Sequence, residues 1–298
     1  MPDNMKNTGN RRVAEAKAHK KRMGSSLLFR DAENLYFGTG RRRNLNKALS
    51  LYLAAAKLGH IAAARNAAWM LSTGDGACRS PKISAELFRF AAERGDSYSQ
   101  YRLGMVLRDG WGVRRNLAEA VSWFRKAAGG NDRDAMHELG WAYLRGRGIG
   151  RDIRKAFHWF RESAINGDPI SMCNVADMYL WGDGVPRNLS KAFYWFREGA
   201  RSGEVRSMYE LGVCYEHGES VPANPRRAVY WYRKAAQAGH RRAQYNLGLC
   251  LLRGEGVKRN FDEAVAWLRK ARSQGHKGAA KVLNHLRTRD GRKLEMSR

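Results

Sequence analysis

The chain has 298 residues, 43% of them hydrophobic, and its 55 Lys and Arg against 28 Asp and Glu give a formal net charge of +27. The apolar content excludes global disorder, and the lack of a long uncharged apolar run predicts no membrane span. The first residues lack the apolar stretch of a secretory signal, and four cysteines are too few for a disulfide framework. We therefore expect an intracellular protein of a reducing compartment, the cytoplasm or, as the alternative, an organelle matrix.

Residues 1–25 are polar and basic. Their positive residues are Arg11, Arg12, Lys17, Lys20, Lys21 and Arg22. Such a run predicts a basic N-terminal arm that could reach nucleic acid or an anionic surface. An organellar presequence is the alternative, and Asp3, Glu15 and weak amphipathicity count against it.

Glycines recur at 36-residue steps through the rest of the chain. The first series is Gly38, Gly74, Gly110, Gly146, Gly182, Gly218 and Gly254. A second series lies two residues further on, with Ser220 in place of glycine in one copy, and a third begins at Gly59. The register is unbroken, which predicts a tandem array of about seven repeats.

Each repeat is predicted to hold two helices. In residues 133–145 the first helix carries small and apolar residues at helical spacing, and residues 117–129 show the same pattern for the second helix. Trp123, Trp159, Trp195, Trp231 and Trp267 recur in the second helices and are expected to fill each layer of the core. Neither helix can bury its apolar face alone, so neighbouring repeats must stack.

Helix-capping residues mark the start of each predicted helix. The second helices follow Asn44, Ser80, Asn116, Asp152, Asn188, Asn224 and Asn260. Asp96, Asp132 and Asp168 precede first helices, and His60, His240 and His276 occupy the same repeat position. We therefore expect these histidines to be structural rather than metal ligands.

The repeats are predicted to end in a single capping helix. Residues 277–288 resemble a lone first helix, which would cover the last layer. The predicted solenoid therefore covers residues 26–288, and residues 289–298 form a basic C-terminal tail.

The repeat pattern resembles that of the Sel1-like repeat family, which is related to the tetratricopeptide class. Residues 135–167 and 243–275 match the family pattern closely, with its Leu-Gly pair, Gly-x-Gly turn and Trp position. The first two repeats depart from it, with Asp31-Ala32 and Ala67-Ala68 in place of Leu-Gly. The resemblance implies an all-α, right-handed α-solenoid that acts as an adaptor or scaffold and not as a catalyst.

No motif predicts an enzyme, a cofactor site or a metal site. The Gly-rich residues 146–150 fall on the repeat series and do not follow a strand, so they do not predict a dinucleotide site. Cys78, Cys173, Cys214 and Cys250 lack the regular pair per repeat of the family's secreted, Cys-rich branch. This argues against that branch and against the hydrolase activity associated with it.

The inner face of the solenoid is a candidate groove for a protein partner. By analogy with tetratricopeptide stacks, fixed first-helix positions should line it with aromatic and apolar side chains. The candidates are Tyr98, Tyr101, Trp141, Tyr209, Tyr245 and Leu249. Each could instead pack against a neighbouring repeat, an alternative that the sequence leaves open.

Two columns of arginine are a candidate anion-binding surface. Arg115, Arg151 and Arg187 share the position just before the second helix, and Arg125, Arg161, Arg197, Arg233 and Arg269 share one within it. Asparagine at most second-helix caps removes a negative charge, and the excess of Arg over Lys favours bidentate contacts with phosphate or carboxylate. A solvated face in a protein of basic composition is the alternative.

We expect a non-catalytic scaffold that binds protein partners through the groove and an anionic partner through the arginine columns. The alternative is an RNA- or ribonucleoprotein-associated structural protein, within an organellar or ribosomal particle. The sequence does not predict the oligomeric state.

Overall fold

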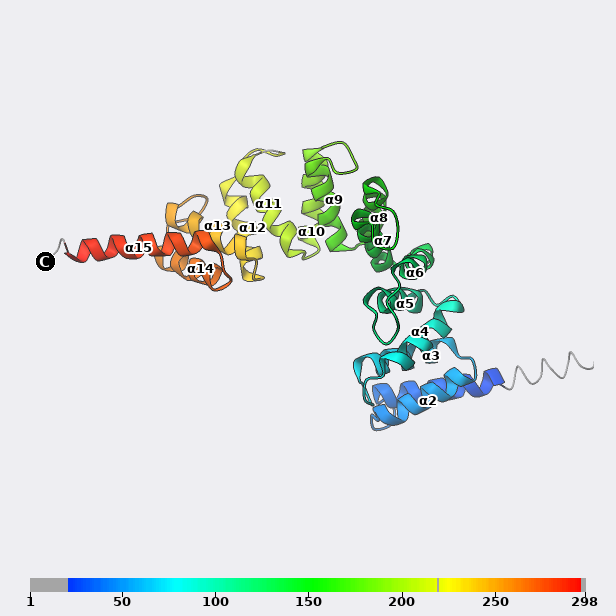
Figure 1. The fold of residues 1–298 in the computed structure, drawn as a ribbon. Coiled ribbons are helices and arrows are strands. Elements are labelled where there is room, and N and C mark those ends of the chain that lie inside the picture. The colour runs from blue at the N-terminus through cyan, green and yellow to red at the C-terminus, as the bar shows by residue number, and fades with distance from the viewer. Residues whose placement is uncertain (1–20, 219, 296–298) are drawn as a thin grey trace, which may run out of the picture. The chain divides into compact units, whose positions relative to one another are not determined.

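The computed structural model describes the backbone of residues 21–295 except residue 219, and side chains as far as residue 286. Residues 21–37 are helical, which includes the last five residues of the predicted arm; its first 20 residues lie outside the described part. Fourteen further helices follow (Figure 1). They are α2 (Leu45–Lys57), α3 (Ile61–Thr73), α4 (Pro81–Glu93), α5 (Ser97–Asp109), α6 (Leu117–Gly129), α7 (Arg133–Arg145), α8 (Ile153–Ile165), α9 (Pro169–Trp181), α10 (Leu189–Arg201), α11 (Val205–His217), α12 (Pro225–Gln237), α13 (Arg241–Arg253), α14 (Phe261–Ser273) and α15 (Lys277–Glu295).

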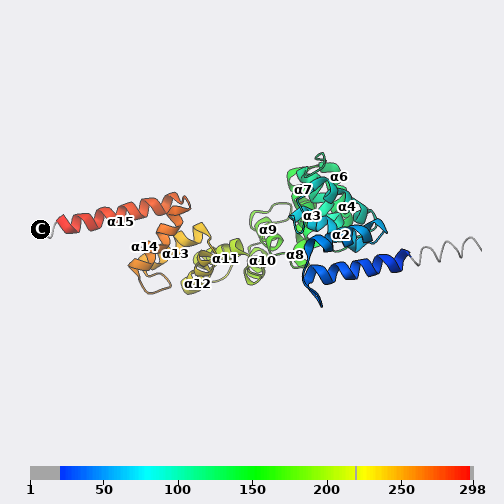
Figure 2. The same ribbon diagram turned by 90° about the horizontal axis from the view of Figure 1, so that it is seen from below.

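The chain forms two compact units, Met1–Asp152 and Ile153–Arg298. Within the first unit each helix from α2 to α7 packs against the next one in the chain, and within the second unit the same holds from α8 to α15. Figures 1 and 2 show the helices of the second unit in chain order in both views. The described residues contain no strand. The all-α repeat architecture is therefore confirmed.

From the second repeat on, the second residue of each Gly-x-Gly turn lies against the start of the second helix of the repeat before it. A Cβ on Gly76 would lie 2.6 Å from the carbonyl carbon and 2.7 Å from the carbonyl oxygen of Leu45, the first residue of α2. Gly76 also has a φ of +80°, which L side chains rarely adopt. In the sixth repeat Ser220 replaces this glycine, and its hydroxyl donates to the Leu189 carbonyl at 3.0 Å. This position therefore fixes the contact between a turn and the second helix of the repeat before it.

The core of each repeat is centred on the residue that follows the tryptophan position. This corrects the prediction that the tryptophans themselves fill each layer of the core. The residue that follows the tryptophan position is at most 2% exposed in all seven repeats. The seven residues are Tyr52, Phe88, Phe124, Phe160, Phe196, Tyr232 and Leu268. Trp123 is buried as predicted, but the four later tryptophans are only half-buried.

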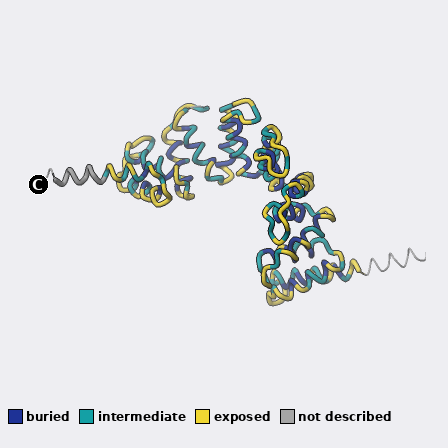
Figure 3. Tube along the Cα trace, viewed as in Figure 1, coloured by how far each residue is buried: buried dark blue, intermediate teal, exposed yellow. Residues whose placement is uncertain are grey.

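Small residues on the first helices make room for these central side chains. A Cβ on Gly212 would lie 2.6 Å from the ring of Tyr232, so this helix pair can pack closely only with glycine. Figure 3 shows the buried segments on the facing sides of the helices, while the connecting turns are mostly exposed.

The last helix covers the end of the second unit. Leu268 and Ala271 of α14 pack with Ala279, Val282 and Leu283 of α15. The predicted cap is therefore present, and α15 continues past residue 288 to Glu295. None of the helices described here is long and apolar enough to cross a membrane.

Histidine caps three of the first helices. The Nδ1 atoms of His60, His240 and His276 accept hydrogen bonds from the backbone N–H groups of Ala63, Ala243 and Ala279 at 3.2–3.3 Å. Each imidazole also stacks on an aromatic ring of the preceding first helix, with centroids 4.3–4.6 Å apart. The rings are those of Phe29, Tyr209 and Tyr245. The caps are thus structural, as expected.

We expect acidic pH to lower the folding stability of the protein by protonating these capping histidines. Burial lowers the pKa of His60, His240 and His276 below its ordinary value. A lowered folded-state pKa means that the unfolded chain binds protons first, so the stabilisation is complete above the unfolded-state pKa and is lost as pH falls through the folded-state pKa. A protonated Nδ1 cannot accept the capping hydrogen bond, which is worth about 0.5–2 kcal/mol.

The His240→Asp variant isolates this effect. Aspartate keeps the cap, as Asp96 does by accepting from Ser99 N–H at 2.8 Å. Its melting temperature should fall less than that of the wild type between about pH 7.5 and about pH 5, the range in which histidine titrates. Equal pH dependence in both proteins would contradict a role for His240 protonation.

Candidate functional site

Three hollows follow one another along the first helices of the first unit. They have volumes of about 280, 390 and 400 Å³ and lie beside Trp69, between Trp69 and Met105, and beside Trp141. Trp69, Met105 and Trp141 occupy the same repeat position. Repeats two to four therefore each place one large apolar side chain on this face, whereas the first repeat has Glu33 at this position.

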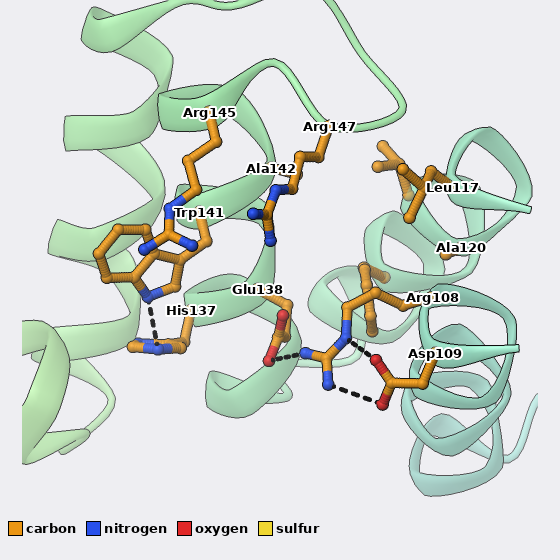
Figure 4. Close-up of a pocket in the computed structure, with 12 residues that line it drawn as sticks. Arg108, Asp109, Leu117, Ala120, His137, Glu138, Trp141, Ala142, Arg145 and Arg147 are labelled. Atoms are coloured by element: carbon orange, nitrogen blue, oxygen red, sulfur yellow. Dashed lines mark hydrogen bonds and ion pairs between the residues drawn. The ribbon is translucent and has the colours of Figure 1, made fainter. Parts of the chain in front are cut away.

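The third hollow is lined by α5, α6 and α7 (Figure 4). Arg108 crosses its base, where Nε and Nη2 lie 2.8 and 2.9 Å from the two carboxylate oxygens of Asp109, and Nη1 lies 2.7 Å from Glu138 Oε1. The hydrogen bonds that Arg108 donates to the carboxylates of Asp109 and Glu138 raise its pKa. The guanidinium is thus fixed between two carboxylates and joins α5 to α7.

Trp141 forms an apolar wall of this hollow and is half-buried. Its Nε1 donates to His137 Nε2 at 3.0 Å, and the Arg145 guanidinium carbon lies 4.3 Å from the ring centroid. Arg147 also lines the hollow, and Figure 4 shows the guanidinium groups of Arg108, Arg145 and Arg147 around it. The indole is therefore held in place beside a rim of positive charge.

The other two groove candidates of the first unit lie outside this hollow. Tyr98 is 37% exposed, with its ring 6.4 Å from that of Trp69. Tyr101 is half-buried, its ring 6.2 Å from that of Phe124, and burial raises the pKa of its hydroxyl to about 12. Tyr98 is therefore accessible, whereas Tyr101 contributes mainly to packing.

In the second unit, Tyr209 and Tyr245 pack against the histidine caps described above, which is the alternative that the sequence left open. Tyr209 also lines a hollow of about 540 Å³ with Arg206, Glu210 and Arg242. Leu249 is half-buried on α13. The predicted groove positions are thus partly interface residues and partly accessible ones.

The first arginine column has local partners that the sequence analysis missed. The Nε atoms of Arg115, Arg151 and Arg187 donate to the carbonyl oxygens of the residues seven positions earlier, at 3.0, 3.2 and 3.0 Å. These carbonyls belong to the last turn of the preceding helix, where cations are favoured. This column therefore helps to end the first helices.

The second column also has local partners. Arg125 donates to the Tyr143 hydroxyl at 3.0 Å, Arg197 Nε lies 3.1 Å from Glu198, and Arg161 Nη1 lies 3.6 Å from Glu162. Arg233 forms an ion pair with Glu263 of the next repeat, and Arg269 is exposed. The side chains of this column thus differ in their partners from repeat to repeat.

Sequence reasoning missed Glu138 and Arg145 as site residues. The repeat gave no signal for Glu138: the Arg89–Glu119 and Arg233–Glu263 ion pairs share one repeat position and join second helices, whereas Arg108–Glu138 joins two first helices. No group of three His, Cys, Asp or Glu side chains within the described part could hold a metal ion.

Comparisons with known proteins agree with this architecture. The Sel1 repeat model matches residues 25–60, 61–96, 97–132, 133–168, 169–204, 205–240 and 241–276. The structure of c5321, a protective antigen of uropathogenic Escherichia coli with an SLR fold, has 30% identity and a TM-score of 0.83, and the match covers 89% of this chain. A Sel1 repeat protein from Oxalobacter formigenes has 28% identity and a TM-score of 0.77, with 96% of this chain and 82% of that one covered.

The chain spans 57% of the length of the c5321 structure. No curated protein matches the sequence. The seven contiguous matches cover most of the sequence, and the chain belongs to the Sel1 repeat family.

Proposed function

We propose that this protein is a non-catalytic scaffold that binds a segment of a partner protein along the first-helix face of its first unit. The hollow beside Trp141 supports this most directly, because it combines a fixed indole, an apolar wall and an open positive rim. Trp and Arg are the side chains that most often dominate binding energy at protein interfaces.

The lining of this hollow favours one kind of partner side chain. Leu117 of α6 supplies apolar surface beside the buried Val121 and Phe124, and Trp141 stands opposite on α7. Arg145 and Arg147 lie at the hollow with them. An aromatic or aliphatic anchor next to a carboxylate fits this arrangement, as in segments that dock into helical grooves.

Selection of peptides from a displayed random library on the full-length protein tests this proposal. Peptides enriched by the wild type should carry an apolar anchor beside Asp or Glu, and Trp141→Ala should weaken their binding at least tenfold, which corresponds to about 1.4 kcal/mol. Trp181→Ala is the matched control, because Trp181 is 72% exposed and belongs to α9 of the second unit.

Two results would contradict the proposal. One is a failure to enrich any peptide that binds the wild type. The other is equal loss of binding in Trp141→Ala and Trp181→Ala, since the hollow would then have no special role. Circular dichroism of both variants checks that the helices are intact.

A further inference from the structure

Three consecutive second helices of the second unit differ from the second helices α6 and α14 in two ways at once. α8, α10 and α12 share the pattern basic–Ala–x–(His/Tyr)–Trp–(Phe/Tyr)–Arg. The corresponding residues of α6 and α14 begin with Glu and have Ser or Ala before the Trp. The helices that have a basic residue in place of this glutamate thus also have an aromatic or imidazole ring in place of the small residue before the Trp.

The charge difference removes an ion pair between repeats. In the repeats that keep the acid, Glu119 Oε1 lies 2.7 Å from Arg89 Nη1, and Glu263 pairs with Arg233. Lys191 and Arg227 occupy this glutamate position in α10 and α12. The ion pair between repeats is thus lost: Arg161 and Arg197 pair with Glu162 and Glu198 of their own helices instead. Lys191 and Arg227 lie 5.3 and 5.4 Å from the ring centroids of Tyr179 and Tyr215.

The aromatic difference leaves rings at the surface. Tyr194 and Tyr230 are 47% and 52% exposed, and each stands edge-on to the adjacent tryptophan with ring centroids 5.3 and 5.1 Å apart. His158 is exposed and makes the same contact with Trp159 at 5.2 Å. Each neighbouring tryptophan therefore gives an exposed ring a fixed support.

Cations flank these rings. The Arg197 guanidinium carbon lies 5.5 Å from the Tyr194 ring centroid, and Lys234 Nζ lies 5.0 Å from that of Tyr230. The three helices together carry ten Lys and Arg but two Asp and Glu. We call this surface of α8, α10 and α12 the basic aromatic strip.

We propose that the basic aromatic strip binds single-stranded nucleic acid, with bases stacked on His158, Tyr194 and Tyr230 and phosphates against Lys191, Arg197 and Arg227. Single strands are bound without strong sequence preference by grooves and surfaces that combine stacking rings with cations. One ring per helical repeat also matches the way in which other helical repeat proteins read one base per repeat. An acidic protein segment would use the cations but would gain little from rings at a regular interval.

Fluorescence anisotropy with a labelled oligouridine and the full-length protein tests this inference. Tyr194→Ala with Tyr230→Ala keeps every charge and should weaken binding at least tenfold, since stacking is worth about 1–3 kcal/mol per base. Lys191→Glu with Arg227→Glu should weaken binding and lower the slope of log K against log salt by about 2, because two phosphate contacts are lost.

The charge variant also guards against misfolding. It restores the glutamate found in α6 and α14, so Arg161 and Arg197 gain the partner that Arg89 has. Its melting temperature should equal or exceed that of the wild type while its affinity for the oligonucleotide falls. Trp181→Ala, which removes a 72% exposed ring from the first helix α9, is the matched control and should bind like the wild type.

A comparison of ligands tests which class of molecule the basic aromatic strip recognises. The same sequence as RNA, as DNA and as a duplex should show binding of one or both single strands and weaker binding of the duplex, whose bases are already stacked. Unchanged affinity in Tyr194→Ala with Tyr230→Ala would overturn the inference. Competition by polyglutamate as effective as that by the unlabelled oligonucleotide would overturn it in favour of an acidic protein.

Discussion

Gly76→Ala should destabilise the protein by roughly 3 kcal/mol or more, among the largest effects of any single methyl group in the described turns. The new Cβ would lie within 2.8 Å of the backbone and Cβ of Leu45, none of which is the end of a flexible side chain. Relief requires the turn between α3 and α4 to move away from α2. Chemical denaturation followed by circular dichroism measures the loss.

Gly40→Ala is the matched control for this variant. Gly40 holds the same repeat position and a similar φ of +69°, but a Cβ there would meet nothing within 4 Å. Its cost should be only the left-handed backbone strain, about 1–2 kcal/mol. Equal losses for the two variants would show that strain rather than contact between repeats explains the glycine.

Phe196→Ala should cost about 3–5 kcal/mol, as expected when a fully buried phenylalanine is truncated. Phe196 is 1% exposed and lies in the central position of its repeat. Trp195→Ala removes a larger side chain from the preceding position, but it should lower the free energy of unfolding less, because Trp195 is half-buried. Urea denaturation of the two variants compares them directly.

The order of these two effects is the informative result. A greater loss for Trp195→Ala would contradict the assignment of the core to the residue after the tryptophan. Because Trp195 also supports Tyr194, its variant should in addition weaken oligonucleotide binding, whereas a folded conservative variant such as Phe196→Leu should leave it unchanged.

The periodicity of the sequence was sufficient to predict the helices and most of their caps. Ser80 makes no side-chain capping hydrogen bond, and Glu204 caps α11 although it was not predicted to. Glycine spacing and capping residues are local signals, so Asn188 could be identified as the cap that accepts from Lys191 N–H without any knowledge of packing. Local sequence signals could not show whether Trp195 or Phe196 is the core residue. Adjacent residues of a helix are 100° apart, and the crossing angle of the neighbouring helices decides which is covered.

The candidate site was less predictable for the same reason. Trp141 was found because its repeat position is fixed, but its bond to His137 depends on rotamers. Arg151 resembled a solvent-facing charge, yet its Nε reaches back to the Leu144 carbonyl through the shape of the turn. Contacts of this kind depend on turn geometry that residue types alone do not specify.

The pairing of each cap with the first helix before it has a consequence for how the array can change length. Tyr209 and His240 fall within one matched period, residues 205–240, and Arg65 and Asp96, whose charges lie 3.0 Å apart, fall within residues 61–96. A whole module gained or lost at these boundaries therefore carries its own matched pair with it. Ion pairs such as Arg89–Glu119 join two periods and would be separated by an insertion after residue 96. The array can thus vary in number of modules while each such module keeps the contacts that lie within its own period.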